Sequence, residues 1–155
     1  MKEISYNPLT GLFTWSYGRR GVKAGSVAGS LTRDGYLQIK INHRVYSAHR
    51  LAMFLANGKW PIGEVDHIDG NRLNNALANL RDVSRSVNSQ NQRKAQSDNK
   101  SSGLLGVTWN KQHKKWQSKI MVNKVYHHVG LFDCSEVAHA AYIEKKRQLH
   151  VGCTI

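Results

Sequence analysis

The 155-residue sequence has little cysteine, few acidic residues and no long apolar run, and each shortage excludes a class of protein. Two cysteines, Cys134 and Cys153, are too few for a disulfide framework, and no Cys-x-x-Cys pair is present to hold zinc. The longest apolar run, residues 51–56, is far shorter than the roughly 18 residues that span a bilayer. The first residues, MKEISYNPL, lack the apolar stretch of a signal peptide, so the sequence predicts a cytoplasmic protein.

Acidic side chains are the scarcest charged group, with 10 Asp and Glu against 23 Lys and Arg, a formal net charge of +13. The excess is spread along the chain, with 14 basic against 7 acidic residues in 1–99 and 9 against 3 in 100–155. Such a charge favours a nucleic-acid partner, although a solvated basic surface would give the same count. A membrane-surface protein would need one dominant basic amphipathic helix, which the sequence lacks.

The first stretch of the chain predicts short strands followed by helices. Strands are expected at 12–15, 36–41 and 44–47, the last two forming a hairpin around Asn42-His43. Ser47 is expected to cap a helix that buries Leu51, Phe54 and Leu55 and ends at Gly58. A second helix should begin at Asp82 or Ser84.

The polar residues 94–103 predict a linker between two domains, 1–93 (core about 46–93) and 104–155. In the second domain, strands are expected at 106–110, 115–122 and 124–129. A helix should follow over 135–150, with Asp133 as its N-cap. This helix is expected to turn five apolar residues towards the sheet: Val137, Ala138, Ala141, Tyr142 and Leu149.

The most informative segment for chemistry is residues 65–81, which contains Val-Asp-His-Ile-Asp-Gly-Asn-Arg. The Asp66 carboxylate is a hard oxygen ligand suited to Mg²⁺, and the neighbouring His67 can take up a proton near neutral pH. Asn88, on the following helix, could add an amide oxygen as a second metal ligand. The alternative is that these Asp, Asn and Gly residues only build turns.

At this point the sequence resembles the HNH endonucleases, in particular the zinc-free subset found among phage and intron homing endonucleases. The resemblance covers about residues 6–93, and its motifs are His49-Arg50-Leu51, the segment Val65 to Asn71, Asn79-Leu80-Arg81 and Asn88. It implies a ββα-metal motif in an α+β protein.

The resemblance also implies roles for four residues. Asp66 and Asn88 would hold one Mg²⁺ or Mn²⁺ per active site, with no zinc, and His67 would be the general base. Asn79 would tie down the loop that aims His67. His49 would contact phosphate or brace the start of its helix, and bracing is favoured. Four arginines are candidate phosphate contacts: Arg50, Arg72, Arg81 and Arg85.

Strand alternation in the C-terminal domain predicts one sheet face that packs on the helix and one open, polar, basic face. The open face should carry six candidate DNA contacts: Thr108, Asn110, Gln117, Lys119, Tyr126 and His128. A sheet of this size can enter the major groove, although an ordinary solvent-exposed face would have the same pattern.

The pattern from Gly106-Val107-x-Trp109 through Gly130-x-Phe132 to Ala141-Tyr142 resembles the DNA-binding domain of plant ethylene-response factors (Apetala-two-like). Several arginines that those proteins use on bases are replaced here by Thr108, Lys119 and Tyr126, so base specificity does not carry over.

The sequence thus predicts a monomeric, metal-dependent endonuclease of the phage homing type that acts on double-stranded DNA. The main alternative is a DNA-binding regulator with a vestigial nuclease fold. Because Asp66, His67 and Asn88 precede the linker, a fragment of residues 1–96 is predicted to keep the chemistry.

Overall fold

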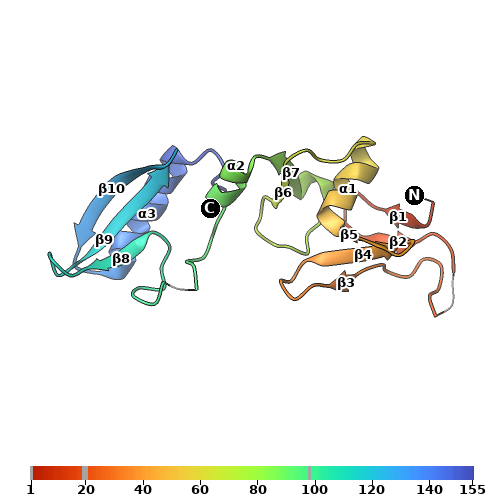
Figure 1. Cartoon of the computed structure of the whole chain (residues 1–155), viewed down its shortest axis with the longest axis horizontal. Coiled ribbons are helices and arrows are strands. Elements are labelled where there is room, and N and C mark those ends of the chain that lie inside the picture. Colours follow the sequence, from red (N-terminus) through yellow and green to blue (C-terminus); the bar gives the residue numbers. More distant parts are fainter. Residues whose placement is uncertain (1, 19–20, 98) are drawn as a thin grey trace. The chain divides into compact units, whose positions relative to one another are not determined.

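The computed structural model describes residues 2–18, 21–97 and 99–155. The chain divides into two compact units, and the division along the sequence falls between Arg85 and Ser86. Each unit combines antiparallel sheet with helix (Figure 1). The predicted boundary lay after residue 93, and the segment in between proves to pack with the second unit.

The described residues of the first unit form three small antiparallel sheets and helix α1 (Ala48–Asn57). Strands β1 (Ile4–Tyr6) and β2 (Phe13–Trp15) form one hairpin. The second sheet contains β3 (Ser30–Leu31), β4 (Leu37–Ile41) and β5 (Arg44–Ser47). The third pairs β6 (Glu64–His67) with β7 (Leu80–Val83), and a 3₁₀ turn over Leu77–Asn79 precedes β7.

The predicted hairpin at 36–47 is confirmed, and its register follows from its turn. Asn42 and His43 have φ of 46° and 63°, which a two-residue type I′ turn requires at both central positions. The turn pairs Ile41 with Arg44 and directs Ile39 and Ile41 into the core. Leu51 of α1 is fully buried in the same core, so this sheet and α1 share one hydrophobic cluster.

The ends of α1 agree with the sequence only in part. Gly58 ends the helix as predicted, in the left-handed conformation at φ 72°, and its N–H donates to the Phe54 carbonyl. Ser47 stands at the N-cap position, but its side chain makes no capping hydrogen bond. Of the two predicted starts of the second helix, Asp82 was wrong, because it lies in β7 and its carboxylate accepts the N–H groups of Ile62 and Gly63. The helix begins at Arg85, directly after the other candidate, Ser84.

The second unit contains helix α2 (Arg85–Gln90), from Ser86 onward, and a three-stranded sheet packed on helix α3 (Ser135–Leu149). The strand order is β10 (Val125–Phe132), β9 (Lys115–Val122) and β8 (Val107–Asn110), all antiparallel. This is the predicted arrangement of three strands and one helix (Figure 1). Strand β10 is longer than expected because a bulge between His128 and Gly130 lets the pairing continue to Phe132.

Two expectations for α3 were wrong. Its N-cap is Cys134, since the Asp133 carboxylate lies 3.1 Å from the Lys115 ammonium instead. Val137 is 54% exposed. Lys146 of the same helix is 1% exposed, a degree of burial that is rare for a lysine.

The predicted linker is partly ordered by its own side chains. Asn99 Nδ2 donates to the Leu104 carbonyl at 2.9 Å, and Ser102 Oγ donates to the Val107 carbonyl at 2.7 Å. Polar residues that suggested a free linker therefore bind backbone groups at the start of β8.

Among the residues that the structure describes, no helix has both the length and the apolar character needed to cross a bilayer.

Candidate active site

The β6–β7 hairpin holds the two residues on which the predicted chemistry depends. Asp66 pairs across the hairpin with Arg81, and His67 pairs with Leu80. Both Asp66 and His67 are buried, with 7% and 4% of their surface exposed. Adjacent residues of a strand point to opposite faces, so the carboxylate and the imidazole have different neighbours.

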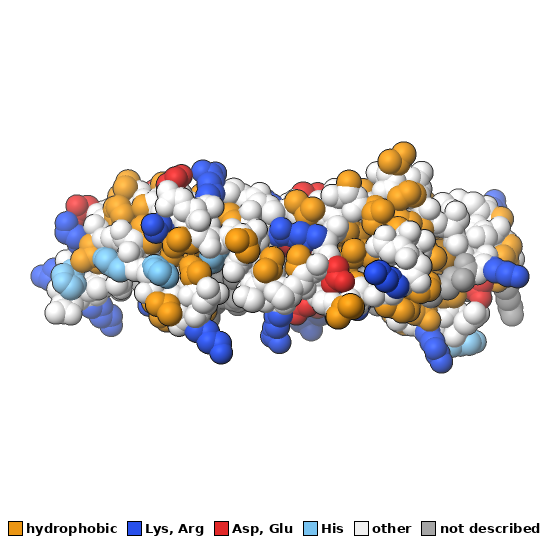
Figure 2. Space-filling view, turned by 90° about the horizontal axis from the view of Figure 1, so that it is seen from above, with side chains coloured by type: hydrophobic (Ala, Val, Ile, Leu, Met, Phe, Trp, Pro, Cys, Tyr) orange, Lys and Arg blue, Asp and Glu red, His pale blue; other side chains and the backbone are white. Residues whose placement is uncertain are grey.

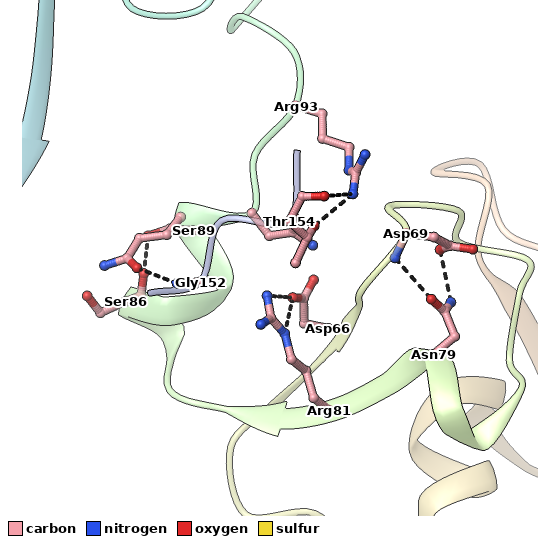
Figure 3. Close-up of polar contacts among 11 residues, drawn as sticks. Asp66, Asp69, Asn79, Arg81, Ser86, Ser89, Arg93, Gly152 and Thr154 are labelled. Carbon is pink, nitrogen blue, oxygen red and sulfur yellow. Dashed lines mark hydrogen bonds and ion pairs between the residues drawn. The ribbon is translucent and has the colours of Figure 1, made fainter. Parts of the chain in front are cut away.

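On one face, Asp66 forms an ion pair with Arg81 (Figure 3). Nε and Nη2 of Arg81 lie 2.9 and 2.7 Å from the same oxygen, Oδ2. Cross-strand register places the two side chains opposite each other, so the cation compensates a carboxylate that would be costly to bury alone. Arg81 was expected to contact phosphate. In the structure its guanidinium forms an ion pair with Asp66.

On the other face, His67 is oriented by Asn75. Nε2 of His67 lies 3.4 Å from Oδ1 of Asn75, while Nδ2 of Asn75 donates to the Leu73 carbonyl at 3.1 Å. An amide oxygen facing Nε2 favours the tautomer with the hydrogen on Nε2, in which Nδ1 is the basic nitrogen. Asn75, which is 1% exposed, was predicted only as a turn residue.

Burial lowers the pKa of His67 below its ordinary value of 6.5. The hydrogen bond to Asn75 and the nearby charges of Asp69 and Asp66 oppose this effect without cancelling it. The imidazole is therefore neutral near pH 7, which is the form that can accept a proton.

His49 lies beside His67. The two rings meet edge to face with centroids 5.2 Å apart, and Tyr36 lies 5.4 Å from His49 and 6.1 Å from His67. Burial, followed by the charges of His67 and Arg50, lowers the pKa of His49 to about 4. A neutral, packed His49 agrees with the bracing role that the sequence favoured.

Asn79 closes the loop between β6 and β7 (Figure 3). Its Nδ2 donates to Asp69 Oδ1 at 2.9 Å and to the Asn74 carbonyl at 2.8 Å, while its Oδ1 accepts the Asp69 N–H at 3.0 Å. Burial alone would raise the pKa of Asp69, but hydrogen bonds from Asn74, from the Asn71 N–H and from Asn79 lower it. The loop is thus held by an ionised carboxylate and an amide.

Asn88 lies on α2, so the ββα order of β6, β7 and α2 along the chain is the one that the HNH resemblance implied. It belongs to the second compact unit, whereas Asp66 and His67 belong to the first. Its role as the second metal ligand stays a prediction.

The three remaining arginines differ in their contacts with the rest of the protein. Arg50 donates to the Gly63 and Pro61 carbonyls at 2.7 and 2.8 Å, so it braces the loop before β6. Arg72 donates to the Asp34 carbonyl and stacks over Tyr36, 4.7 Å from the ring centroid. The Arg85 side chain is 91% exposed and makes a long ion pair with Glu64 at 3.9 Å. Arg85 therefore remains the best placed of the three for phosphate.

The described residues contain no group of three or more His, Cys, Asp or Glu side chains placed to hold a metal ion. A site built around Asp66 must draw further ligands from amides or water. Mg²⁺ accepts such a site, since it usually takes one or two protein carboxylates and keeps several waters.

The second unit presents the six predicted DNA contacts on one sheet face. Register places Thr108 opposite Gln117 and Lys119 opposite His128. The remaining two, Asn110 and Tyr126, follow from strand alternation and from the pairing of Tyr126 with Met121. The Lys119 ammonium lies 5.0 Å from the Tyr126 ring centroid.

The helix packs on the opposite face of the sheet, where Ser118 and Ile120 are buried. The six residues therefore form an open polar face, here called the open sheet face. Figure 2 shows Lys and Arg side chains spread over the surface in view, with few acidic side chains among them.

Comparison with known proteins agrees with this site. A family model described as HNH endonuclease matches residues 46–90, which contain β6, β7 and α2. Protein 3.8 of Escherichia phage T7 is 38% identical over 96 residues, a match that covers 61% of this chain and 77% of the phage protein. The chain belongs to the HNH endonuclease family. It is accordingly a nuclease, and nucleases of this family generally use divalent metal ions.

A solved structure of the HNH homing endonuclease I-HmuI, concerned with its DNA binding and cleavage, is also similar. The identity is 28%, and the match covers 58% of this HNH endonuclease and 51% of that chain, with a TM-score of 0.45. The chain thus spans about half the length of that protein, and the family assignment rests on the two sequence matches.

Proposed function

We propose that this HNH endonuclease hydrolyses phosphodiester bonds of double-stranded DNA in a reaction that depends on Mg²⁺ or Mn²⁺, as a free-standing nuclease of the phage homing type. One observation carries the proposal: a buried, neutral His67, oriented by Asn75, follows a buried Asp66 on the same strand. A carboxylate for metal and an imidazole for proton transfer are the groups that metal-assisted hydrolysis needs.

His67 would act as the general base. Its Nδ1 would accept a proton from the water whose oxygen attacks phosphorus, while the bond from phosphorus to the 3′ oxygen breaks. The products would be a 5′ phosphate and a 3′ hydroxyl, the latter after protonation of the departing oxygen. Asn75 would keep Nδ1 available by holding the hydrogen on Nε2.

Asp66, with Asn88 as the second protein ligand, would hold the divalent ion, which supplies charge neutralisation at the scissile phosphate. Arg81 would compensate the carboxylate when the ion is absent, since its guanidinium already lies on Oδ2. Asn79 would keep the loop after His67 in place through Asp69.

The open sheet face would anchor the duplex by entering a groove, as the resemblance to the plant ethylene-response factors implies. Support comes from the shared face of the six residues and from the net positive charge of residues 100–155. The family match ends at residue 90, so this part rests on the sheet itself. We expect a monomer. Because Protein 3.8 comes from a phage, we also expect the enzyme to act in the cytoplasm of a bacterial host.

Incubation of supercoiled plasmid with the protein in Mg²⁺, in Mn²⁺ and in EDTA tests the proposal. Nicked or linear DNA should form with either metal and not in EDTA. Binding of the plasmid in a mobility-shift assay, with no cleavage under any condition, would instead identify a DNA-binding regulator with a vestigial nuclease fold.

A further inference from the structure

Helix α2, which carries the predicted ligand Asn88, is too short to be stable on its own. It spans only Arg85–Gln90 and contains no buried residue. A helix this short lacks both the length and the packed apolar face that stabilise helices. Its placement must therefore come from contacts with other parts of the chain.

Those contacts come from the segment that follows α3. The Gly152 N–H donates to Gln90 Oε1 at 2.9 Å. Thr154 Oγ1 donates to Asn91 Oδ1. The same oxygen accepts from Arg93 Nη2 at 2.7 Å (Figure 3). The end of α2 is thus bonded to residues about 60 positions later in the sequence, all within the second unit.

Close packing makes Gly152 hard to replace. A Cβ atom at this position would collide with the Val87 carbonyl oxygen and would lie 3.0 and 3.1 Å from Val87 Cγ1 and Gln90 Cβ. The segment after α3 therefore approaches α2 at the residue immediately before Asn88, and only glycine allows the observed separation.

Lys146 of α3 adds a fourth bond from the same side. Its ammonium donates to the Gln92 carbonyl, just beyond α2, although the residue is 1% exposed. Burying a lysine is costly unless its ammonium is hydrogen-bonded, so a structural purpose for this position is expected. By binding the Gln92 carbonyl, Lys146 fixes the segment that directly follows α2.

We propose that Gly152 and Thr154, supported by Lys146, are positioning residues of the nuclease that set α2 and thereby Asn88. This inference rests on the proposed function, in which Asn88 is a metal ligand. It also argues against the expectation that residues 1–96 alone keep the chemistry, because that fragment lacks all three anchors.

The test compares full-length Gly152→Ala and Thr154→Val with two controls. Val151→Ala changes an 83% exposed residue of the same segment, and Thr154→Ser keeps the hydroxyl. In metal-free protein, hydrogen exchange of residues 86–92 should be faster in the two test variants only. Calorimetric Mn²⁺ binding should weaken by about tenfold or more, as when the residues that support a metal ligand are lost.

Plasmid cleavage should correspondingly need more Mg²⁺ for half-maximal rate in the test variants, with DNA binding in EDTA unchanged. Equal exchange and equal Mn²⁺ affinity in Thr154→Val and Thr154→Ser would overturn the inference, even if the melting temperature fell. If Gly152→Ala does not fold, the Thr154 pair decides. Asn88→Ala separates the two proposals: wild-type Mn²⁺ affinity in that variant would refute the assigned ligand, whatever the anchor variants do.

Discussion

The Arg81 guanidinium binds one carboxylate oxygen of Asp66, the residue that the proposed function assigns to metal binding, with Nε and Nη2 at 2.9 and 2.7 Å from Oδ2. This arrangement lets the strand pair bury an aspartate, 7% exposed, before any metal arrives. An ion at Asp66 would therefore share the carboxylate with Arg81 or replace it.

Arg81→Met should destabilise the metal-free protein more than the metal-bound protein. Loss of hydrogen bonds to a charged group should lower the free energy of unfolding by about 2 kcal/mol in EDTA. In Mg²⁺ the loss should be smaller, because Asp66 keeps a counter-charge. Urea unfolding under both conditions measures this.

Arg85→Met is the control, since the Arg85–Glu64 pair is exposed and 3.9 Å long and should contribute about 0.5 kcal/mol or less. An Arg81→Met effect of the same size with and without Mg²⁺ would contradict metal binding at Asp66.

Asn79→Asp should slow cleavage without weakening DNA binding. The new carboxylate would face Asp69 and repel it, which would release the loop that follows His67. A displacement of about 1 Å in a catalytic site can cost about 10²-fold in rate. Single-turnover cleavage and DNA affinity should be compared with those of Leu73→Ala, which changes an exposed residue of the same loop. Unchanged cleavage by Asn79→Asp would show that the loop does not aim His67.

The low pKa of His49, about 4, predicts a pH-dependent stability. As pH falls from about 6.5 to about 4, His49 becomes protonated in the unfolded chain but stays neutral in the folded protein. The free energy of unfolding therefore decreases over this pH range. His49→Gln should make the free energy of unfolding depend less steeply on pH. Part of the dependence should remain, because the pKa of His67 is also lowered in the folded protein. Urea unfolding at about pH 7 and about pH 4.5 tests the difference. A wild-type dependence in the variant would mean that His49 is not buried as a neutral ring.

Much of this fold could be predicted from sequence because its signals are local. The hairpin at Asn42-His43 and the C-terminal sheet follow from alternating side chains and turn residues, and the Asp66-His67 motif stands out by composition. The missed features are long-range. Asn75 orients His67 through a side-chain contact, and no pattern of polar and apolar residues in the sequence predicts such a contact.

The contacts of Arg50 and Lys146 could not be predicted from the sequence for a different reason. Arg50 and Lys146 donate to backbone carbonyls at distant positions, and every backbone offers such acceptors. A basic side chain in sequence therefore does not reveal whether it faces solvent, phosphate or the protein's own backbone.

Lys119→Ala should weaken DNA binding and leave the chemical step intact. Loss of one phosphate contact on duplex DNA should reduce the slope of log K against log salt concentration by about 0.9. Lys145→Ala removes the same charge from α3, on the other side of the sheet, and should change the slope less. Binding titrations over a range of salt measure both. Equal slopes for the two variants would mean that the open sheet face does not contact DNA.

The central claim is that His67 is the general base, and its most direct measurement is single-turnover cleavage of plasmid DNA by His67→Ala, with and without added imidazole. The rate should fall by about 10²–10⁴-fold, with DNA affinity unchanged, because a general base acts in the transition state. Imidazole should restore part of the rate in proportion to its neutral fraction. His43→Asn, which changes an exposed histidine in a turn that tolerates asparagine, should cleave like the wild type. Cleavage by His67→Ala at the wild-type rate, at saturating Mg²⁺, would contradict the account.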